Sequence, residues 1–240
     1  MSSRREKRVL RKELKKPSFN IRTINPLTEN QQVAFDAYDD GKNLMLHGIA
    51  GTGKSFISLY LGLDELLNNN SNYDKIIIIR SVVPTRDMGF LPGNTKEKAK
   101  AYESPYYAIF TELFGRSDAY DYMKNKNQVE FMTTSFIRGI TFNNAIIIVD
   151  EIANCTLHEL DSVITRIGKN CRIMFCGDFR QSDFIKKADR GGLLDFLRII
   201  QKMKSFEFID FDENDILRSS LVKDYIIQKN TNKELLILKN

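Results

Sequence analysis

The sequence predicts an α/β fold in which a parallel sheet is covered by helices on both faces. Two observations support this prediction. Short, continuous apolar runs recur along the chain and alternate with segments of helical periodicity, as in repeated strand–helix–strand units. Several of these runs end directly in glycine or in charged residues, which is typical of parallel strands that lead into a ligand site at their carboxyl edge.

The composition indicates one large domain with room for an insertion. The chain has 240 residues and a net charge of +5, and no apolar run approaches the roughly 18 residues that a membrane span needs. Residues 1–16 lack the apolar stretch of a secretory signal, so a cytoplasmic protein without membrane contact is expected. The three cysteines lack zinc-site spacing and, with only two histidines, indicate free thiols instead of a metal centre.

The positive charge is concentrated at the amino terminus. Residues 1–16 contain eight Arg or Lys against two Glu, which leaves the remainder of the chain nearly neutral. Such a tail attracts nucleic acid weakly, although a solubilising arm without a partner explains the charge equally well. We expect a flexible tail and linker over 1–26, one folded domain over 27–230 with a helical insertion at 94–127, and a short tail over 231–240.

The first predicted strand, at 44–47, and a helix from Phe56 to Leu67 flank a phosphate-loop motif. The segment from Gly48 to Ser55 fits G-x-x-x-x-G-K-[ST] without a mismatch. Glycines let several backbone N–H groups surround phosphate oxygens, and the following helix points its positive end at the same anion. The expected nucleotide contacts are Gly48, Ile49, Ala50, Gly51, Thr52, Gly53, Lys54, Ser55 and Phe56. The expected ligands are therefore a nucleotide and Mg²⁺, with Lys54 on the β- and γ-phosphates and the Ser55 hydroxyl on the metal.

A helix is predicted from Leu27 to about Tyr38, upstream of the phosphate loop. Thr28 and Gln31 have the spacing of a capping box, so Gln31 has one interpretation as a helix cap. Its position also resembles the adenine-reading segment of superfamily-1 helicase-like ATPases, in which a Gln amide both donates to and accepts from the base. Both interpretations remain open, and Gln32 is a second candidate for the same role.

The second predicted strand, at 76–79, ends in polar residues. Arg80 and Ser81 follow it directly and are candidates for contact with a nucleic-acid phosphate or with the nucleotide. The alternative for Arg80 is a pair with a nearby carboxylate.

The insertion at 94–127 is predicted to form about two helices over the active edge of the sheet. It is rich in aromatic residues, namely Tyr102, Tyr106, Tyr107, Phe110, Phe114, Tyr120 and Tyr122. These rings can stack on nucleic-acid bases or can form the small core of the insertion itself.

A short strand at 129–133 and a buried strand at 145–149 follow the insertion. Arg138, between them, is a third candidate for nucleic-acid contact. The second of these strands ends in Asp150 and Glu151. Carboxylates placed there suit hydrolysis, because Asp150 can hold Mg²⁺ through its water shell and Glu151 can orient and deprotonate the attacking water.

The last third of the chain continues the alternation. Helices are predicted at 157–167, 191–202 and 219–228, and strands at 171–176 and 206–211. The strand at 171–176 leads into Gly177-Asp178-x-x-Gln181, which would place an amide beside the γ-phosphate, where it senses whether that phosphate is present. Arg218 either forms a local salt bridge or is supplied to the nucleotide of a neighbouring chain.

Taken in order, these motifs resemble those of the PhoH-like family of ATPases. They are Gly48-x-x-Gly51-Thr52-Gly53-Lys54-Ser55, Arg80-x-x-x-Pro84, Gly89-Phe90-Leu91-Pro92-Gly93, Arg138-Gly139, Asp150-Glu151, Thr165-Arg166-Ile167-Gly168, Gly177-Asp178-x-x-Gln181-x-Asp183 and Ile216-Leu217-Arg218-Ser219-x-Leu221-Val222. The resemblance implies a P-loop NTPase with one RecA-like core, ATP hydrolysis, action on RNA or single-stranded nucleic acid, and a ring-shaped homo-oligomer. It also implies that Arg218 is an arginine finger acting in trans.

One departure from the family pattern affects the predicted function. The family's usual Asp-Glu-Ala-Gln-Asn is replaced by Asp150-Glu151-Ile152-Ala153-Asn154, so Ala153 stands where an amide would link the nucleotide to nucleic acid. An assembly or regulatory ATPase without helicase activity is therefore the alternative, and a small-molecule kinase is a further one. The short chain suggests a minimal stand-alone version such as phages carry.

Overall fold

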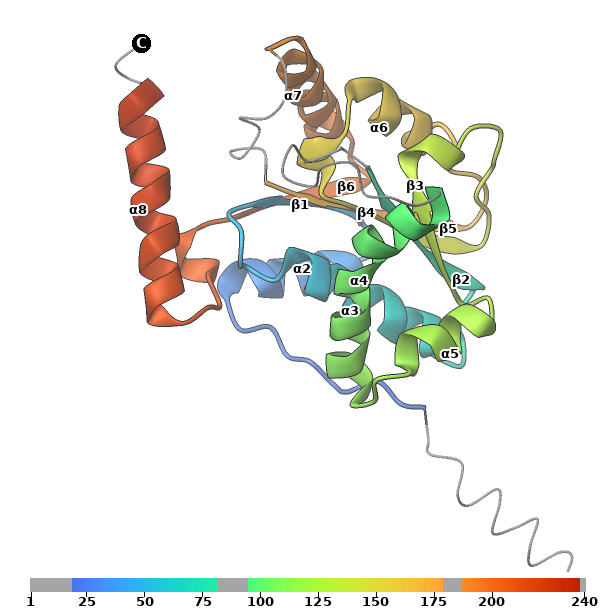
Figure 1. The fold of residues 1–240 in the computed structure, drawn as a ribbon. Coiled ribbons are helices and arrows are strands. Elements are labelled where there is room, and N and C mark those ends of the chain that lie inside the picture. Colours follow the sequence, from blue (N-terminus) through green and yellow to red (C-terminus); the bar gives the residue numbers. More distant parts are fainter. Residues whose placement is uncertain (1–18, 82–94, 179–186, 238–240) are drawn as a thin grey trace, which may run out of the picture.

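The core is a single parallel sheet of six strands (Figure 1). The computed structural model describes residues 19–81, 95–178 and 187–237. The strands are β1 (Asn43–Gly48), β2 (Lys75–Arg80), β3 (Val129–Thr133), β4 (Ala145–Asp150), β5 (Cys171–Gly177) and β6 (Phe206–Phe211). Their order across the sheet is β3-β2-β4-β5-β1-β6, so the strand before the phosphate loop lies inside the sheet between β5 and β6.

Helices cover both faces of this sheet (Figure 1). The α-helices are α2 (Glu29–Asp39), α3 (Lys54–Leu67), α4 (Thr95–Phe114), α5 (Ala119–Asn125), α6 (Leu157–Ile164), α7 (Lys187–Lys202) and α8 (Ser220–Ile237). Helices α2 to α5 pack on one face, α6 and α7 pack on the other, and α8 stands to one side of the sheet. The predicted α/β architecture is therefore confirmed.

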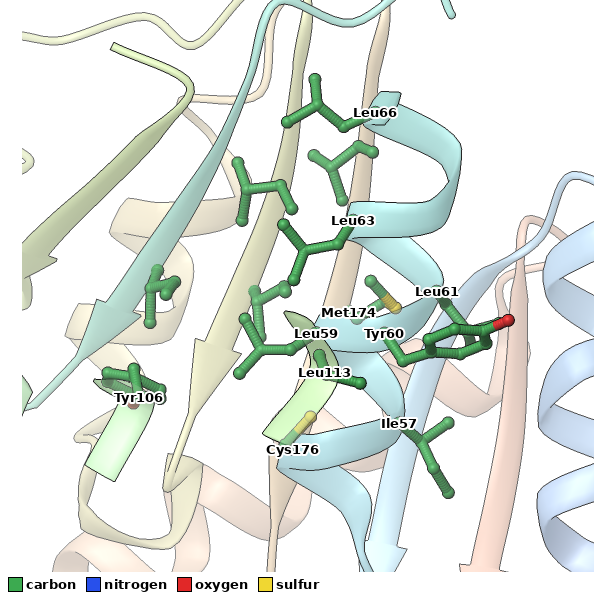
Figure 2. Packing of buried hydrophobic residues seen from close by; sticks show 14 of the residues in the cluster. Ile57, Leu59, Tyr60, Leu61, Leu63, Leu66, Tyr106, Leu113, Met174 and Cys176 are labelled. Atoms are coloured by element: carbon green, nitrogen blue, oxygen red, sulfur yellow. The ribbon is translucent and has the colours of Figure 1, made fainter. Parts of the chain in front are cut away.

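The apolar strand runs are continuous because each strand is buried on both faces. In β2, Ile76 and Ile78 belong to the core under α3, while Ile77 and Ile79 belong to the core under α6 and α7. Helix α3 fills the first of these cores with Ile57, Leu59, Leu63 and Leu66 (Figure 2). This packing fixes the start of α3, and with it the phosphate loop, against the carboxyl edge of the sheet.

The observed elements lie close to the predicted ones, with three differences at helix ends. Helix α6 ends at Ile164 instead of 167, because the following residues pair with Phe142: its N–H donates to the Arg166 carbonyl and its carbonyl accepts from Gly168. Helix α7 begins earlier than predicted, at Lys187, and α8 continues to Ile237.

The segment before α2 packs against the insertion, although it was expected to be part of a flexible linker. The Phe19 ring stacks on Phe114 with centroids 4.5 Å apart, and the Arg22 N–H donates to the Leu113 carbonyl at 2.8 Å. Residues 19–26 therefore extend the folded body. The basic stretch 1–16 lies outside the described residues.

The insertion has its own aromatic core, as one of the two interpretations expected. Tyr106, Phe110 and Tyr120 are fully buried, and the last two meet edge to face with centroids 5.0 Å apart. Buried rings cannot stack on nucleic-acid bases, so these three serve packing. Within the described part of the chain, no helix is long and apolar enough to cross a membrane.

Candidate functional site

The phosphate loop connects β1 to α3 and needs its glycines for steric reasons. Gly48, Gly51 and Gly53 have φ values of 128°, 85° and 86°, a region that residues with a Cβ rarely adopt. A Cβ on Gly48 would lie 2.0 Å from the Phe211 carbonyl oxygen of β6. Gly53 is the residue at which the chain turns into α3. The loop conformation expected from the motif is therefore present.

Lys54 lies across this loop. Its Nζ donates to the carbonyl oxygens of Gly48 at 2.8 Å and Ile49 at 2.7 Å, and it lies 3.2 Å from the Thr52 hydroxyl. Burial lowers the pKa of Lys54, while the nearby negative charges of Asp178 and Glu151 act in the opposite direction. The ammonium group thus sits in a partly dry position, where its attraction for phosphate is strong.

Ser55 and Asp150 meet at the start of α3. The Ser55 hydroxyl donates to Asp150 Oδ1 at 2.7 Å, and the same oxygen accepts the Glu151 N–H at 3.0 Å. Asp150 Oδ2 accepts the Tyr106 hydroxyl at 2.9 Å. A hydroxyl beside a carboxylate is an oxygen donor set that suits Mg²⁺, which retains several waters and needs few protein ligands. Within the described ranges, no cluster of three or more His, Cys, Asp or Glu forms a fuller metal site.

Glu151 begins the turn after β4 in a left-handed conformation. Its φ is 54°, a strained value for a residue other than glycine, and about half of its side chain (47%) is exposed. Burial and the adjacent charge of Asp150 raise the pKa of Glu151, whereas Arg80 and Lys54 lower it. Arg80 Nη2 lies 4.0 Å from Glu151 Oε1, as expected from the neighbouring ends of β2 and β4. The sequence left open whether Arg80 pairs with a nearby carboxylate, and the structure shows this pair with Glu151.

These side chains border a cavity of about 600 Å³. Its lining combines the phosphate loop, the ends of β4 and β5, the segment before α2, helix α4 and the segment after β6: Ile24, Asn25, Leu27, Gln31, Ala50, Gly51, Gly53, Lys54, Ser55, Phe56, Ile57, Ile109, Glu112, Asp150, Glu151, Gly177, Asp178, Leu217 and Arg218. Three residues of the predicted loop, Gly48, Ile49 and Thr52, do not line the cavity and are instead buried within the loop structure.

Gln31 lies at the cavity but its amide is already engaged by the protein. Thr28 caps α2 by accepting the Gln31 N–H, whereas the Gln31 side chain accepts from Leu27 at 2.8 Å and donates to the Thr52 carbonyl at 3.3 Å. The capping interpretation is therefore correct for Thr28, but the Gln31 amide does not close the reciprocal box. Gln32 contacts Asp36 on the exposed side of α2.

Arg218 lies over the phosphate loop of its own chain. A Cβ placed on Gly51 would be 3.1 Å from Arg218 Cγ, and the N–H of Leu217 donates to the Gly51 carbonyl. The turn before it is fixed by Asn30, whose amide donates to Asp215 at 2.8 Å. No ion pair joins Arg218 to another described residue, so the local salt bridge considered from the sequence is not observed.

The remaining predicted residues lie at or beyond the rim. Ser81 is buried and donates to Glu159 at 3.2 Å, which occupies its hydroxyl. Arg138 is exposed and contacts His158 at 3.5 Å. Gln181 and the Gly-Phe-Leu-Pro-Gly motif at 89–93 lie outside the described residues.

Sequence patterns predicted that the insertion lies over the active edge of the sheet, but they did not show which of its side chains reach the site, nor that the segment before α2 contributes to it. Tyr106, Ile109 and Glu112 reach the site from α4, and Ile24 and Asn25 reach it from the segment that precedes α2. The helical spacing of Tyr106 with Phe110 was visible, but spacing alone does not show which side chain reaches another element.

A phosphate loop that faces paired carboxylates at the ends of parallel strands defines a P-loop nucleotide-binding protein with a RecA-like α/β fold. Consistent with this class, the family model described as PhoH-like protein matches residues 23–229. The chain belongs to the PhoH-like family.

Curated relatives support the same assignment. A PhoH-like protein of Synechocystis is 32% identical over 177 residues, covering 73% of this chain and 53% of the relative. Protein PhoH of Escherichia coli K12 is 32% identical over 176 residues, covering 72% of this chain and 49% of that protein. The chain thus spans about half the length of these relatives.

Solved structures show more distant similarity. The large terminase of the thermophilic bacteriophage D6E aligns with a TM-score of 0.48 at 11% identity, covering 84% of this chain and 50% of the terminase. The Pif1 helicase of Candida albicans aligns with a TM-score of 0.37 at 15% identity, covering 78% of this chain and 40% of the helicase.

Proposed function

We propose that this protein binds ATP and hydrolyses it with the help of Mg²⁺. The observation that carries the proposal is the convergence of Lys54, Ser55, Asp150 and Glu151 on one cavity. A phosphate-binding lysine, two oxygen ligands and a carboxylate base are the groups that phosphoryl transfer to water requires.

Each side chain has a role that follows from its position. Lys54 holds the β- and γ-phosphates, and its contacts with the loop carbonyls would be exchanged for phosphate oxygens. Ser55 and Asp150 would hold Mg²⁺, which supplies positive charge to the phosphate oxygens when bound. Glu151 accepts a proton from the attacking water, and its raised pKa brings it closer to the pH at which a general base is effective.

Gln31 is the residue that we propose to distinguish adenine from other bases. Its carboxamide retains one N–H and one lone pair beyond the contacts with Leu27 and Thr52, and it borders the cavity. Replacing Gln31 by Ala should reduce the preference for ATP over GTP in competition binding. Gln32→Ala is the control, because that side chain contacts Asp36 on the exposed side of α2.

Single-stranded nucleic acid, RNA in particular, is the candidate activator of hydrolysis. Arg80 ends β2, and Arg138, whose side chain is exposed, follows the end of the adjacent strand β3, so the chain carries a positive residue after each of two neighbouring strands. Salt-sensitive stimulation by a single-stranded homopolymer, reduced in Arg138→Ala, would support this role. Hydrolysis that does not respond to the polymer at low salt would favour an assembly or regulatory ATPase.

The decisive experiment for the proposed reaction replaces Glu151 by Gln. The variant should bind ATP with normal affinity and release phosphate at least about a hundredfold more slowly, which is the usual contribution of a general base. Glu130→Gln is a matched control, because Glu130 pairs with Lys75 away from the cavity. Near-normal phosphate release by Glu151→Gln would contradict the role, and phosphate passed to an acceptor instead of water would indicate a kinase.

A further inference from the structure

Helix α4 of the insertion contacts one carboxylate of the site, Asp150, through the hydroxyl group of Tyr106. Tyr106 is 1% exposed, and its hydroxyl donates to Asp150 Oδ2 at 2.9 Å (its ring is labelled in Figure 2). Asp150 is itself 5% exposed. A buried phenol beside a buried carboxylate stays protonated, and burial followed by the charge of Asp150 raises the pKa of Tyr106 well above its ordinary value.

The three hydrogen bonds to Asp150 divide between its two oxygens. Ser55 and the Glu151 N–H both donate to Oδ1, whereas the Tyr106 hydroxyl donates to Oδ2. A carboxylate held at both oxygens cannot rotate about its terminal bond without breaking one of these contacts. The plane of the carboxylate is therefore fixed by residues from three separate elements.

Fixed orientation is what a metal-binding carboxylate requires. Groups that hydrogen-bond a ligand from behind commonly determine metal affinity, and their removal typically lowers it tenfold or more. Without the Tyr106 hydroxyl, Oδ2 would remain a buried charged oxygen with no described donor, and Asp150 would gain from turning toward water.

We propose that Tyr106 is a positioning residue for the proposed magnesium site, so that the insertion contributes to the site through α4. This inference rests on the proposed function. The same helix also approaches the second carboxylate, because the Tyr102 carbonyl lies 3.5 Å from Arg80 Nη1 and Arg80 pairs with Glu151.

The test compares ADP affinity in Mg²⁺ with ADP affinity in excess chelator, measured by calorimetry on the full chain. The ratio of the two affinities isolates the metal from the rest of the nucleotide site and requires no turnover. For Tyr106→Phe, the ratio should fall about tenfold while the affinity in chelator stays unchanged, which corresponds to the loss of one hydrogen bond to a charged group.

Tyr120→Phe is the matched control. Tyr120 is also a fully buried tyrosine of the insertion, and its hydroxyl donates to a buried carboxylate, Glu103, at 2.7 Å. The substitution should lower thermal stability as Tyr106→Phe does, but leave the affinity ratio at the wild-type value. A ratio reduced equally in both variants would overturn the proposal, because the effect would then come from loosening the insertion.

A wild-type ratio in Tyr106→Phe would also overturn the proposal, whether the two affinities stay unchanged or fall by the same factor. Should Tyr106→Phe fail to fold, 3-fluorotyrosine at position 106 retains the hydroxyl, and its fluorine resonance should shift when Mg²⁺ is added to the ADP complex; an unchanged resonance would contradict the role. A wild-type chain that binds no nucleotide at all would instead refute the proposed function.

Discussion

The backbone N–H of Leu217 donates to the carbonyl oxygen of Gly51 at 3.1 Å, which joins the segment after β6 to the phosphate loop. This hydrogen bond places the next residue, Arg218, over the loop of the same chain. The sequence resemblance implied that this arginine acts on a neighbouring chain, whereas its position favours action on its own nucleotide.

Replacing Arg218 by Ala should therefore slow ATP hydrolysis about 10³-fold, the lower end of the range for an arginine that stabilises the transferred phosphate. Mixing this variant with Glu151→Gln tests which chain receives the arginine. If Arg218 acts within its own chain, the mixture stays inactive, because each chain lacks one essential group. Recovery of phosphate release upon mixing would show that the arginine acts across an interface.

Removal of Arg80 should change the pH dependence of hydrolysis. Glu151 must be deprotonated to act as a base, and the positive charge of Arg80 lowers its pKa against the raising effects of burial and Asp150. In Arg80→Ala the pKa of Glu151 rises further, so activity should be lost at a higher pH on acidification than in the wild type. The control is Lys75→Ala at the other end of β2, where Lys75 pairs with Glu130. If Arg80→Ala lost activity at the same acidic pH as the wild type, the pairing of Arg80 with Glu151 at 4.0 Å would have no influence on the pKa of Glu151.

Two glycine substitutions should differ sharply in their effect on stability. Gly48→Ala combines a positive φ with a Cβ 2.0 Å from the Phe211 carbonyl oxygen, so the free energy of unfolding should drop by about 3 kcal/mol or more. Gly41 has a φ of 82° but open space around it, and Gly41→Ala should cost only about 1 kcal/mol. Denaturant titration measures both values. If the two variants lost the same free energy of unfolding, the backbone of β6 would have to shift away from the new Cβ at little cost.

Tyrosine ionisation should be coupled to unfolding at alkaline pH. Burial raises the pKa of Tyr38, Tyr106 and Tyr120, so the folded chain retains protons that the unfolded chain releases near pH 10. Because the folded state then binds more protons than the unfolded state, stability should decrease as the pH rises above 10. The chain has no Trp, so tyrosinate absorbance is easily followed. Part of the signal should appear only together with loss of circular dichroism. If all tyrosines ionised before the chain unfolded, the raised pKa values expected for the buried Tyr38, Tyr106 and Tyr120 would be contradicted.

The sequence predicted the sheet and the phosphate site well because both depend on local patterns. Isoleucine runs such as 76–79 indicate strands buried on two faces, and the motif from Gly48 to Ser55 has strict steric requirements that few other sequences meet. The placement of Asp150 beside Ser55 also follows, since parallel strands bring their carboxyl ends to one edge.

Contacts between distant segments could not be predicted in this way. Tyr106 follows the same helical spacing as its neighbour Phe110, yet only the packed structure shows that its hydroxyl meets Asp150, 44 residues away. The end of α6 was missed for a related reason. Residues 166 and 167 precede the local stop signal of Gly168, and they leave the helix because Phe142 offers backbone hydrogen bonds to this segment.

The attachment of residues 19–26 to α4 has a mechanical consequence. The amino-terminal segment holds the far end of that helix through Phe19 and Arg22, while Tyr106 in the same helix holds Asp150. A pulling force applied at the amino terminus would therefore load α4 before it loaded the sheet. Tension on this segment would accordingly be transmitted to Asp150 through α4.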